Sequence, residues 1–141
     1  MFLPHLKSQI NKFQIPMFEH SLEERCHEFA KRVRKFCRNL KIDVGNFEDI
    51  KQLVRASGSV GANYIEANEN VGKGDLKYRI KVCRKEAKEC MHFLGLVELF
   101  GDKELEKERL VLVDEANQLK KIFSTMLLNI IENSKEFVSA G

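Results

Sequence analysis

The sequence predicts an all-α protein that folds as an antiparallel up-down-up-down four-helix bundle. Only two prolines occur, Pro4 and Pro16, so proline blocks no helix in the rest of the 141-residue chain. Apolar residues recur at alternating steps of three and four through four long segments, which is the spacing of one helix face. The breaks between these segments are short, and short loops between long helices favour antiparallel neighbours.

We expect one domain, the bundle at residues 18–141, preceded by residues 1–17 as an N-terminal arm or a short extra helix. The four helices are expected at about 21–42, 46–70, 75–100 and 102–137. Ser21 with Glu24 has the pattern of a capping box, and Asn46 and Asp102 are the predicted N-caps of the second and fourth helices. The third helix is expected to begin near Asp75.

More apolar residues are present than four simple core seams require. The additional apolar residues lie at the end of the third helix and late in the fourth: Met91, Phe93, Leu96, Leu99, Phe100, Leu127, Leu128 and Ile131. A helix that is apolar on two sides usually has a second partner, so we expect a homo-oligomer. A wider core stripe within one subunit is the alternative.

The cysteines Cys26, Cys37, Cys83 and Cys90 form no CxxC pair and fall mostly on apolar helix faces. Free cysteines of this kind favour a reducing, cytoplasmic compartment. The N-terminus lacks the apolar core of a signal peptide, and no apolar run reaches 18 residues, so we expect no membrane span.

Two Glu-x-x-His pairs, Glu24/His27 and Glu89/His92, each resemble part of a di-iron carboxylate site. The heptad positions place all four side chains away from the bundle centre, so we expect no metal and no cofactor. No combination of a nucleophile with a histidine and a carboxylate suggests catalysis, and the sequence therefore predicts a protein that is not an enzyme.

Basic residues gather on two helices and are the candidate contacts to nucleic acid. They are Lys31, Arg32, Lys35 and Arg38 on the first helix, and Lys77, Lys81, Arg84 and Lys88 on the third. Such clusters bind phosphate backbones by releasing counterions. With a net charge of only +3, solvated helix faces with intrahelical ion pairs are the alternative.

The stretch RASGSVGANYIEANE places small residues in the middle of the second helix, where glycine costs about 1 kcal/mol relative to alanine. We interpret it as a packing surface that a neighbouring helix can approach closely all round this segment. Asn63 and Glu66 lie one turn apart beside it. With Arg79 or Lys85 as the partner of Glu66, they are expected to form a structural polar core, in preference to a catalytic site.

Two motifs resemble the four-helix-bundle proteins encoded by intervening sequences of bacterial 23S rRNA genes. The first is RASGSVGANYIEA, and the second is DLKYRIKVCRKEAKECMHFL, in which Lys85, Glu86, Ala87 and Glu89 match the family pattern. Tyr64 and Ile65 stand where Ile-Ala is usual, Cys90 replaces Thr, and Phe93 replaces Trp.

The resemblance covers about residues 21–130 and implies a ring-like homopentamer. It also implies kinship with the accessory protein of diversity-generating retroelements, which works with reverse transcriptase and nucleic acid. We therefore expect a non-enzymatic oligomer that binds RNA or DNA through its basic helix faces. The alternative is an oligomeric scaffold whose partner is another protein.

Overall fold

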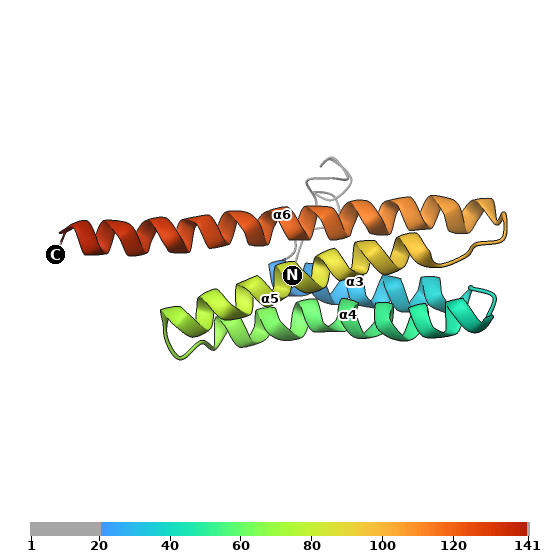
Figure 1. The fold of residues 1–141 in the computed structure, drawn as a ribbon, viewed down its shortest axis with the longest axis horizontal. Coiled ribbons are helices and arrows are strands. Elements are labelled where there is room, and N and C mark those ends of the chain that lie inside the picture. The colour runs from blue at the N-terminus through green and yellow to red at the C-terminus, as the bar shows by residue number, and fades with distance from the viewer. Residues whose placement is uncertain (1–20, 141) are drawn as a thin grey trace, which may run out of the picture.

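The computed structural model describes residues 21–140 and consists there of four α-helices. Their bounds are α3 Leu22–Arg38, α4 Val44–Asn68, α5 Lys73–Leu96 and α6 Lys103–Ala140. Successive helices run in opposite directions (Figure 1), and α3 packs against α6 as well as α4, which closes the bundle. The predicted all-α up-down-up-down fold is confirmed. The predicted N-terminal arm, at 1–17, lies outside the described residues.

The core consists of the apolar seams that the heptad spacing predicts. Four or five residues of each helix meet at the centre, and each is at most 2% exposed: Cys26, Phe29, Val33, Phe36; Leu53, Ala56, Ser57, Val60; Ile80, Cys83, Ala87, Cys90, Leu94; Leu112, Ala116, Leu119, Phe123. Ser57 tolerates burial because its hydroxyl donates to the Val54 carbonyl oxygen at 3.1 Å. Residues nearer the ends of the seams, such as Leu22 and Leu105, are only partly buried.

Two of the three predicted N-caps are confirmed. Ser21 Oγ accepts the Glu24 N–H at 3.0 Å, and Asp102 Oδ1 accepts the Leu105 N–H at 3.1 Å. Asn46 is not the cap of α4: Asp43 takes that place, and its Oδ1 accepts the Asn46 N–H at 2.8 Å. A carboxylate at the cap also interacts favourably with the positive end of the helix dipole.

Asn46 ties together the two loops at one end of the bundle. Its side chain is 1% exposed, and its Nδ2 donates to the carbonyl oxygens of Lys41 at 2.8 Å and Glu98 at 3.0 Å. Its Oδ1 accepts the Glu98 N–H at 2.9 Å. Both backbone groups of Glu98 are therefore engaged outside the helix, and α5 ends at Leu96, four residues before its predicted end.

The first helix also ends earlier than predicted, at Arg38. The Asn39 side chain donates to the Lys35 carbonyl oxygen at 3.0 Å, and the N–H groups of Asn39 and Leu40 bond three residues back. This tight last turn satisfies carbonyl groups that a longer helix would otherwise use.

Two ion pairs join α3 to α6 at matching positions seven residues apart. Arg25 donates from Nε and Nη2 to the two carboxylate oxygens of Glu115, both at 2.8 Å, and from Nη2 to Gln118 Oε1 at 2.7 Å. Arg32 forms the same two-bond pair with Glu108, at 2.7 and 2.8 Å. The Arg25 side chain is 4% exposed and that of Arg32 is 52% exposed, so the first pair is shielded from water and the second is not.

The small-residue stretch of α4 brings α3 close at Gly61. A Cβ built there would lie 3.3 Å from Cys26 Cβ, and one at Gly58 would lie 3.2 Å from Arg34 Nη2. Ala62 is exposed, so the stretch is not closely packed on every side. The expectation of tight packing all round this stretch is therefore wrong.

Alanine substitutions at Gly58 and Gly61 are expected to change the stability of the fold differently. Gly58→Ala should stabilise the fold by about 0.5 to 1 kcal/mol, because the gain in helix propensity costs only a shift at the flexible tip of Arg34. Gly61→Ala should gain nothing or lose stability, because its Cβ would lie 3.3 Å from Cys26 Cβ, an atom that can move only with the α3 backbone. Urea unfolding of both variants measures the difference. Equal stabilisation would show that Gly61 is not a close-contact site.

Along the described chain, no helix combines the length and the apolar content needed to cross a lipid bilayer.

Candidate nucleic-acid interface

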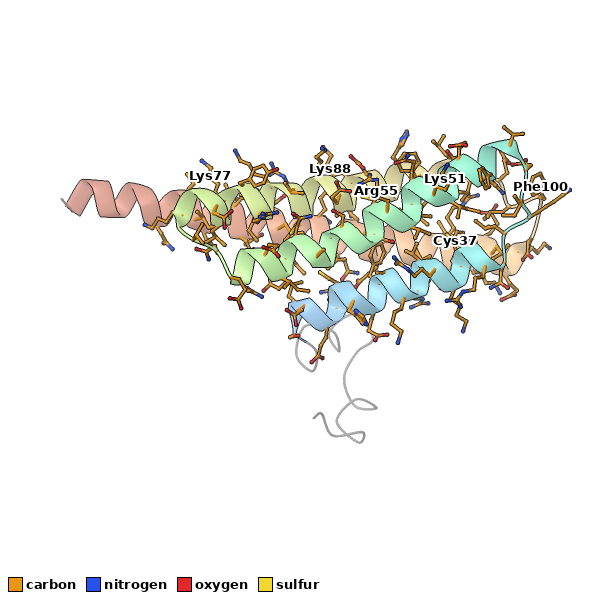
Figure 2. All side chains as sticks on the ribbon, turned by 90° about the horizontal axis from the view of Figure 1, so that it is seen from below. Cys37, Lys51, Arg55, Lys77, Lys88 and Phe100 are labelled. Atoms are coloured by element: carbon orange, nitrogen blue, oxygen red, sulfur yellow. The ribbon has the colours of Figure 1, made fainter. Side chains whose placement is uncertain are left out.

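The outer side of α5 carries a run of five basic residues. Lys77, Lys81, Arg84, Lys85 and Lys88 follow at steps of three, four or one. Lys81, Lys85 and Lys88 are exposed, and the other two are half-buried. At a rise of 1.5 Å per residue, the run is about 17 Å long. Lys77 and Lys88 lie along the same edge of the molecule in Figure 2.

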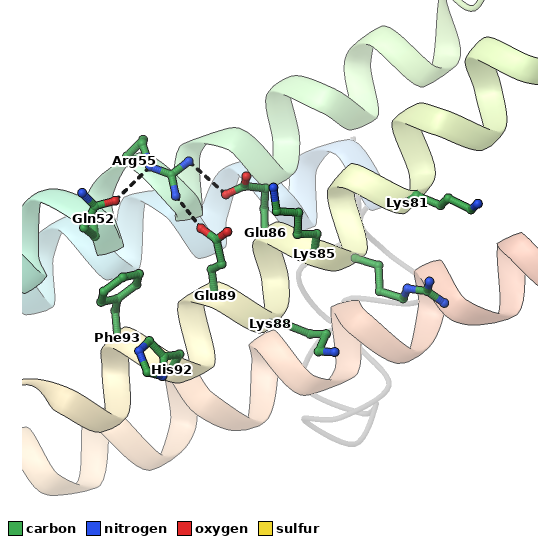
Figure 3. A pocket seen from close by; sticks show the side chains of 10 residues that line it. Gln52, Arg55, Lys81, Lys85, Glu86, Lys88, Glu89, His92 and Phe93 are labelled. Carbon is green, nitrogen blue, oxygen red and sulfur yellow. Dashed lines mark hydrogen bonds and ion pairs between the residues drawn. The ribbon is translucent and has the colours of Figure 1, made fainter.

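Four of these cations, Lys81, Arg84, Lys85 and Lys88, line an open groove of about 810 Å³ (Figure 3). Lys77 is not part of its lining. Gln52 and Arg55 of α4 form the facing side, and Glu86, Glu89, His92 and Phe93 of α5 complete the wall. The structure thus brings together three of the four predicted α5 contacts and adds Lys85, which the sequence placed in a polar core.

Arg55 binds both carboxylates of the groove. Its Nη1 donates to Glu86 Oε2 at 3.1 Å, and its Nη2 forms a short hydrogen bond to Glu89 Oε2. Glu86 is only 6% exposed, so this pair also fixes α4 against α5. Burial acts to lower the pKa of Arg55, but the hydrogen bond to Glu89 and the charges of both carboxylates raise it. The guanidinium therefore stays charged.

The balance of charge in the groove is strongly positive. Five cations, Arg55 and the four basic residues of α5, stand against Glu86 and Glu89, which leaves an excess of three positive charges. Since Arg55 is committed to the carboxylates, the α5 side chains are the groups that remain to meet an anion.

The basic residues of α3 form no comparable site. Arg32 is held by Glu108, whose hydrogen bond raises the pKa of the guanidinium, and Lys31 lies 3.9 Å from Glu28 in an exposed pair. Lys35 and Arg38 are exposed. In Figure 2, α3 follows the edge opposite the one that carries Lys77 and Lys88, so the two predicted clusters do not form one surface.

The structure brings together half of the predicted polar core. Arg79 Nη1 donates to Asn63 Oδ1 at 3.1 Å, and Asn63 Nδ2 donates to the backbone oxygen and hydroxyl of Ser59, both at 2.9 Å. Glu66 and Lys85 are exposed, so their placement in a buried core was wrong. Glu66 lies on the solvent side of α4.

Sequence reasoning missed the ion pairs that join the helices, among them Arg25–Glu115 and Arg55–Glu86. Arg25 and Glu115 each immediately precede a core residue, Cys26 and Ala116. Positions that flank a core seam are where bundle helices form interhelical ion pairs. That rule could have suggested Arg25 and Glu115 as candidates, although not as partners.

The Glu-x-x-His pairs lie on the surface, as the heptad positions indicate. Glu24 and His27 are exposed, Glu89 is bound to Arg55, and His92 is exposed at the groove. In the part of the chain that the structure describes, no three His, Cys, Asp or Glu side chains gather as metal ligands would.

A solved structure with the same fold is that of a protein of unknown function from the S23 ribosomal protein family of Bacteroides thetaiotaomicron VPI-5482. The two chains superpose with a TM-score of 0.64 at 21% sequence identity, over 76% of this chain and 98% of that chain. At this level of identity, the likeness shows a common fold. No protein-family model and no curated protein matches the chain.

Proposed function

We propose that this chain is a non-enzymatic, oligomeric four-helix bundle that binds the phosphate backbone of RNA or DNA through the α5 groove. The observation that carries the proposal is the concentration of charge. The groove alone has an excess of three positive charges, as large as the formal net charge of +3 of the whole chain. Contacts of lysine and arginine to phosphate supply affinity without reading base sequence.

The resemblance of the two motifs to proteins of 23S rRNA intervening sequences supports this function. Kinship with those proteins would make the chain a cytoplasmic homopentamer, and five copies would present five grooves. Assembly is also supported by the outer surface of α6, where Leu110 is 70% exposed and Leu128 is 59% exposed. Large apolar side chains left in water on one helix favour a second subunit as their cover.

A protein-binding scaffold is the second candidate, and a different surface favours it. Val44 is 87% exposed, and Phe47 and Phe100 are 53% and 55% exposed, at the end of the bundle where Asn46 joins the loops. In this alternative, a protein partner covers that end and nucleic acid does not bind at low salt.

Neutralising the groove is expected to weaken nucleic-acid binding. The test variant is Lys81→Gln/Lys85→Gln/Lys88→Gln. The plot of log affinity against log salt has a negative slope, and in this variant its magnitude should be smaller by about 2 to 3, because each lost phosphate contact contributes about 0.7 to 0.9. Fluorescence anisotropy of a labelled oligonucleotide, measured at several salt concentrations, gives the slope.

The matched control is Lys103→Gln/Lys107→Gln/Lys121→Gln, which removes the same charge from exposed positions of α6. It should keep a slope close to that of the wild type. Light scattering shows whether both variants keep the wild-type assembly. If both variants lost the same amount of salt slope, binding would depend only on net charge, and a site on α5 would be contradicted.

A further inference from the structure

We propose that the α5 groove takes single-stranded nucleic acid, with an unpaired base stacked against His92 and Phe93 and the adjoining phosphates on Lys88, Lys85 and Lys81. This inference rests on the proposed function and names its ligand class. It arises from a juxtaposition in the structure: the aromatic pair and the lysines line one groove.

The aromatic pair lies at one end of the basic run. His92 is exposed and Phe93 is half-buried, and their rings meet edge to face with centroids 5.0 Å apart and an interplanar angle of 73°. In Figure 3 both rings lie below the Arg55–Glu89 pair, and Lys88 and Lys81 extend away along α5. The groove therefore has an aromatic end and a cationic end.

The spacing suits a nucleotide. His92 is four residues beyond Lys88, one helical turn or about 6 Å along α5. A base attached to a phosphate held by Lys88 is therefore within reach of the rings. Aromatic rings bind bases through their flat faces, and a groove that pairs such rings with cations has the usual composition of a single-strand site.

A duplex cannot use this combination. Its base faces are stacked on one another inside the helix, so only its phosphates could meet the lysines, and the aromatic end would remain unused. The volume of about 810 Å³ is within the range of pockets for small ligands, and suits a segment of one or two nucleotides.

The groove offers little to read base identity. Gln52 Oε1 accepts a hydrogen bond from Arg55 Nε at 3.3 Å, and both groove carboxylates are bound to Arg55. The Gln52 carbonyl oxygen and both groove carboxylates are thus engaged within the protein. Binding should tolerate any base, with strength set by stacking and phosphate contacts.

The test compares four labelled probes by fluorescence anisotropy on the full chain: a 12-nucleotide thymidine strand, an abasic strand of the same length, a duplex, and thymidine monophosphate. The wild type should bind the thymidine strand about tenfold more tightly than the abasic strand, and more tightly than the duplex. His92→Gln and Phe93→Leu should each reduce the preference for bases and leave abasic binding and the salt slope unchanged.

His27→Gln and Phe47→Leu are the controls, because they remove an exposed histidine and an exposed phenylalanine outside the groove. Both should keep the preference. His92→Gln changes an exposed residue, so it reports on stacking even if Phe93→Leu disturbs packing.

Three results would overturn the inference while the proposed function survives: equal affinity for thymidine and abasic strands, tighter binding of the duplex, or the monophosphate binding as well as the strand. In each case the lysine variant of the groove would still weaken binding. If no probe binds at low salt, both the inference and the proposed function are wrong.

Discussion

Replacing Arg25 by methionine is expected to lower the free energy of unfolding by about 3 kcal/mol or more. The Arg25 side chain is 4% exposed and bonds to Glu115 and Gln118 across the α3–α6 contact. Its removal leaves the Glu115 carboxylate, itself 24% exposed, next to apolar packing without its counter-charge. An uncompensated charge in such a place costs several kcal/mol.

The chain supplies its own control for this prediction. Arg32 and Glu108 repeat the two-bond geometry seven residues along α3, but the Arg32 side chain is 52% exposed. Water and salt screen an exposed pair, so Arg32→Met should cost at most about 1 kcal/mol. The same substitution in the same pair of helices thus isolates the effect of burial.

Urea unfolding monitored by circular dichroism measures both variants. The double variant Arg25→Met/Glu115→Leu should recover much of the stability lost by Arg25→Met, because it removes the second charge as well. Equal costs for Arg25→Met and Arg32→Met would show that burial does not set the strength of these pairs.

The helices and their core faces could be predicted from sequence because both depend on local spacing. Phe29, Val33 and Phe36 are marked as core by steps of three and four alone. Asn46 shows the limit of such reasoning. Either Asp43 or Asn46 can cap a helix, and what decides between them is a bond from Asn46 to Glu98, 52 residues away.

The candidate site likewise has one part that the sequence predicts and another that it does not. The basic run of α5 is visible in the sequence, because residues on one helix face need only helical spacing. Its partner Arg55 comes from α4 and meets Glu86 only through the register of two helices, and the same register leaves Glu66 in solvent. The sequence does not indicate the aromatic end of the groove, because Phe93 falls among the surplus apolar residues of the third helix. Contact between helices decides these roles, and no local pattern encodes it.

Stability is expected to fall steeply above pH 9, because four thiols are buried in the core. Burial raises the pKa of Cys26, Cys83 and Cys90 from 9.0 to about 12, and that of Cys37 to about 11. In the unfolded chain these thiols ionise near pH 9. Since each folded pKa lies above the unfolded one, the stability is complete below pH 9 and is lost as the pH rises toward 12.

The expected loss is large relative to the stability of a domain. Each thiol contributes about 1.4 kcal/mol per pH unit once the unfolded form is ionised, so four contribute about 5 kcal/mol per unit. Relative to pH 7, the loss reaches about 6 kcal/mol at pH 10. Domains of this size are stable by about 5 to 15 kcal/mol, so a loss of this size removes a large part of the stability by pH 10.

The variant Cys26→Ala/Cys83→Ala tests the cause. Urea unfolding at pH 7, 9 and 10 should show that the loss between pH 7 and 10 falls to about half that of the wild type, about 3 kcal/mol. The cost of the smaller side chains is the same at every pH and cancels in that difference, as does the titration of lysines common to both proteins. An unchanged loss in the variant would mean that ionisation elsewhere, rather than burial of the thiols, causes the alkaline instability.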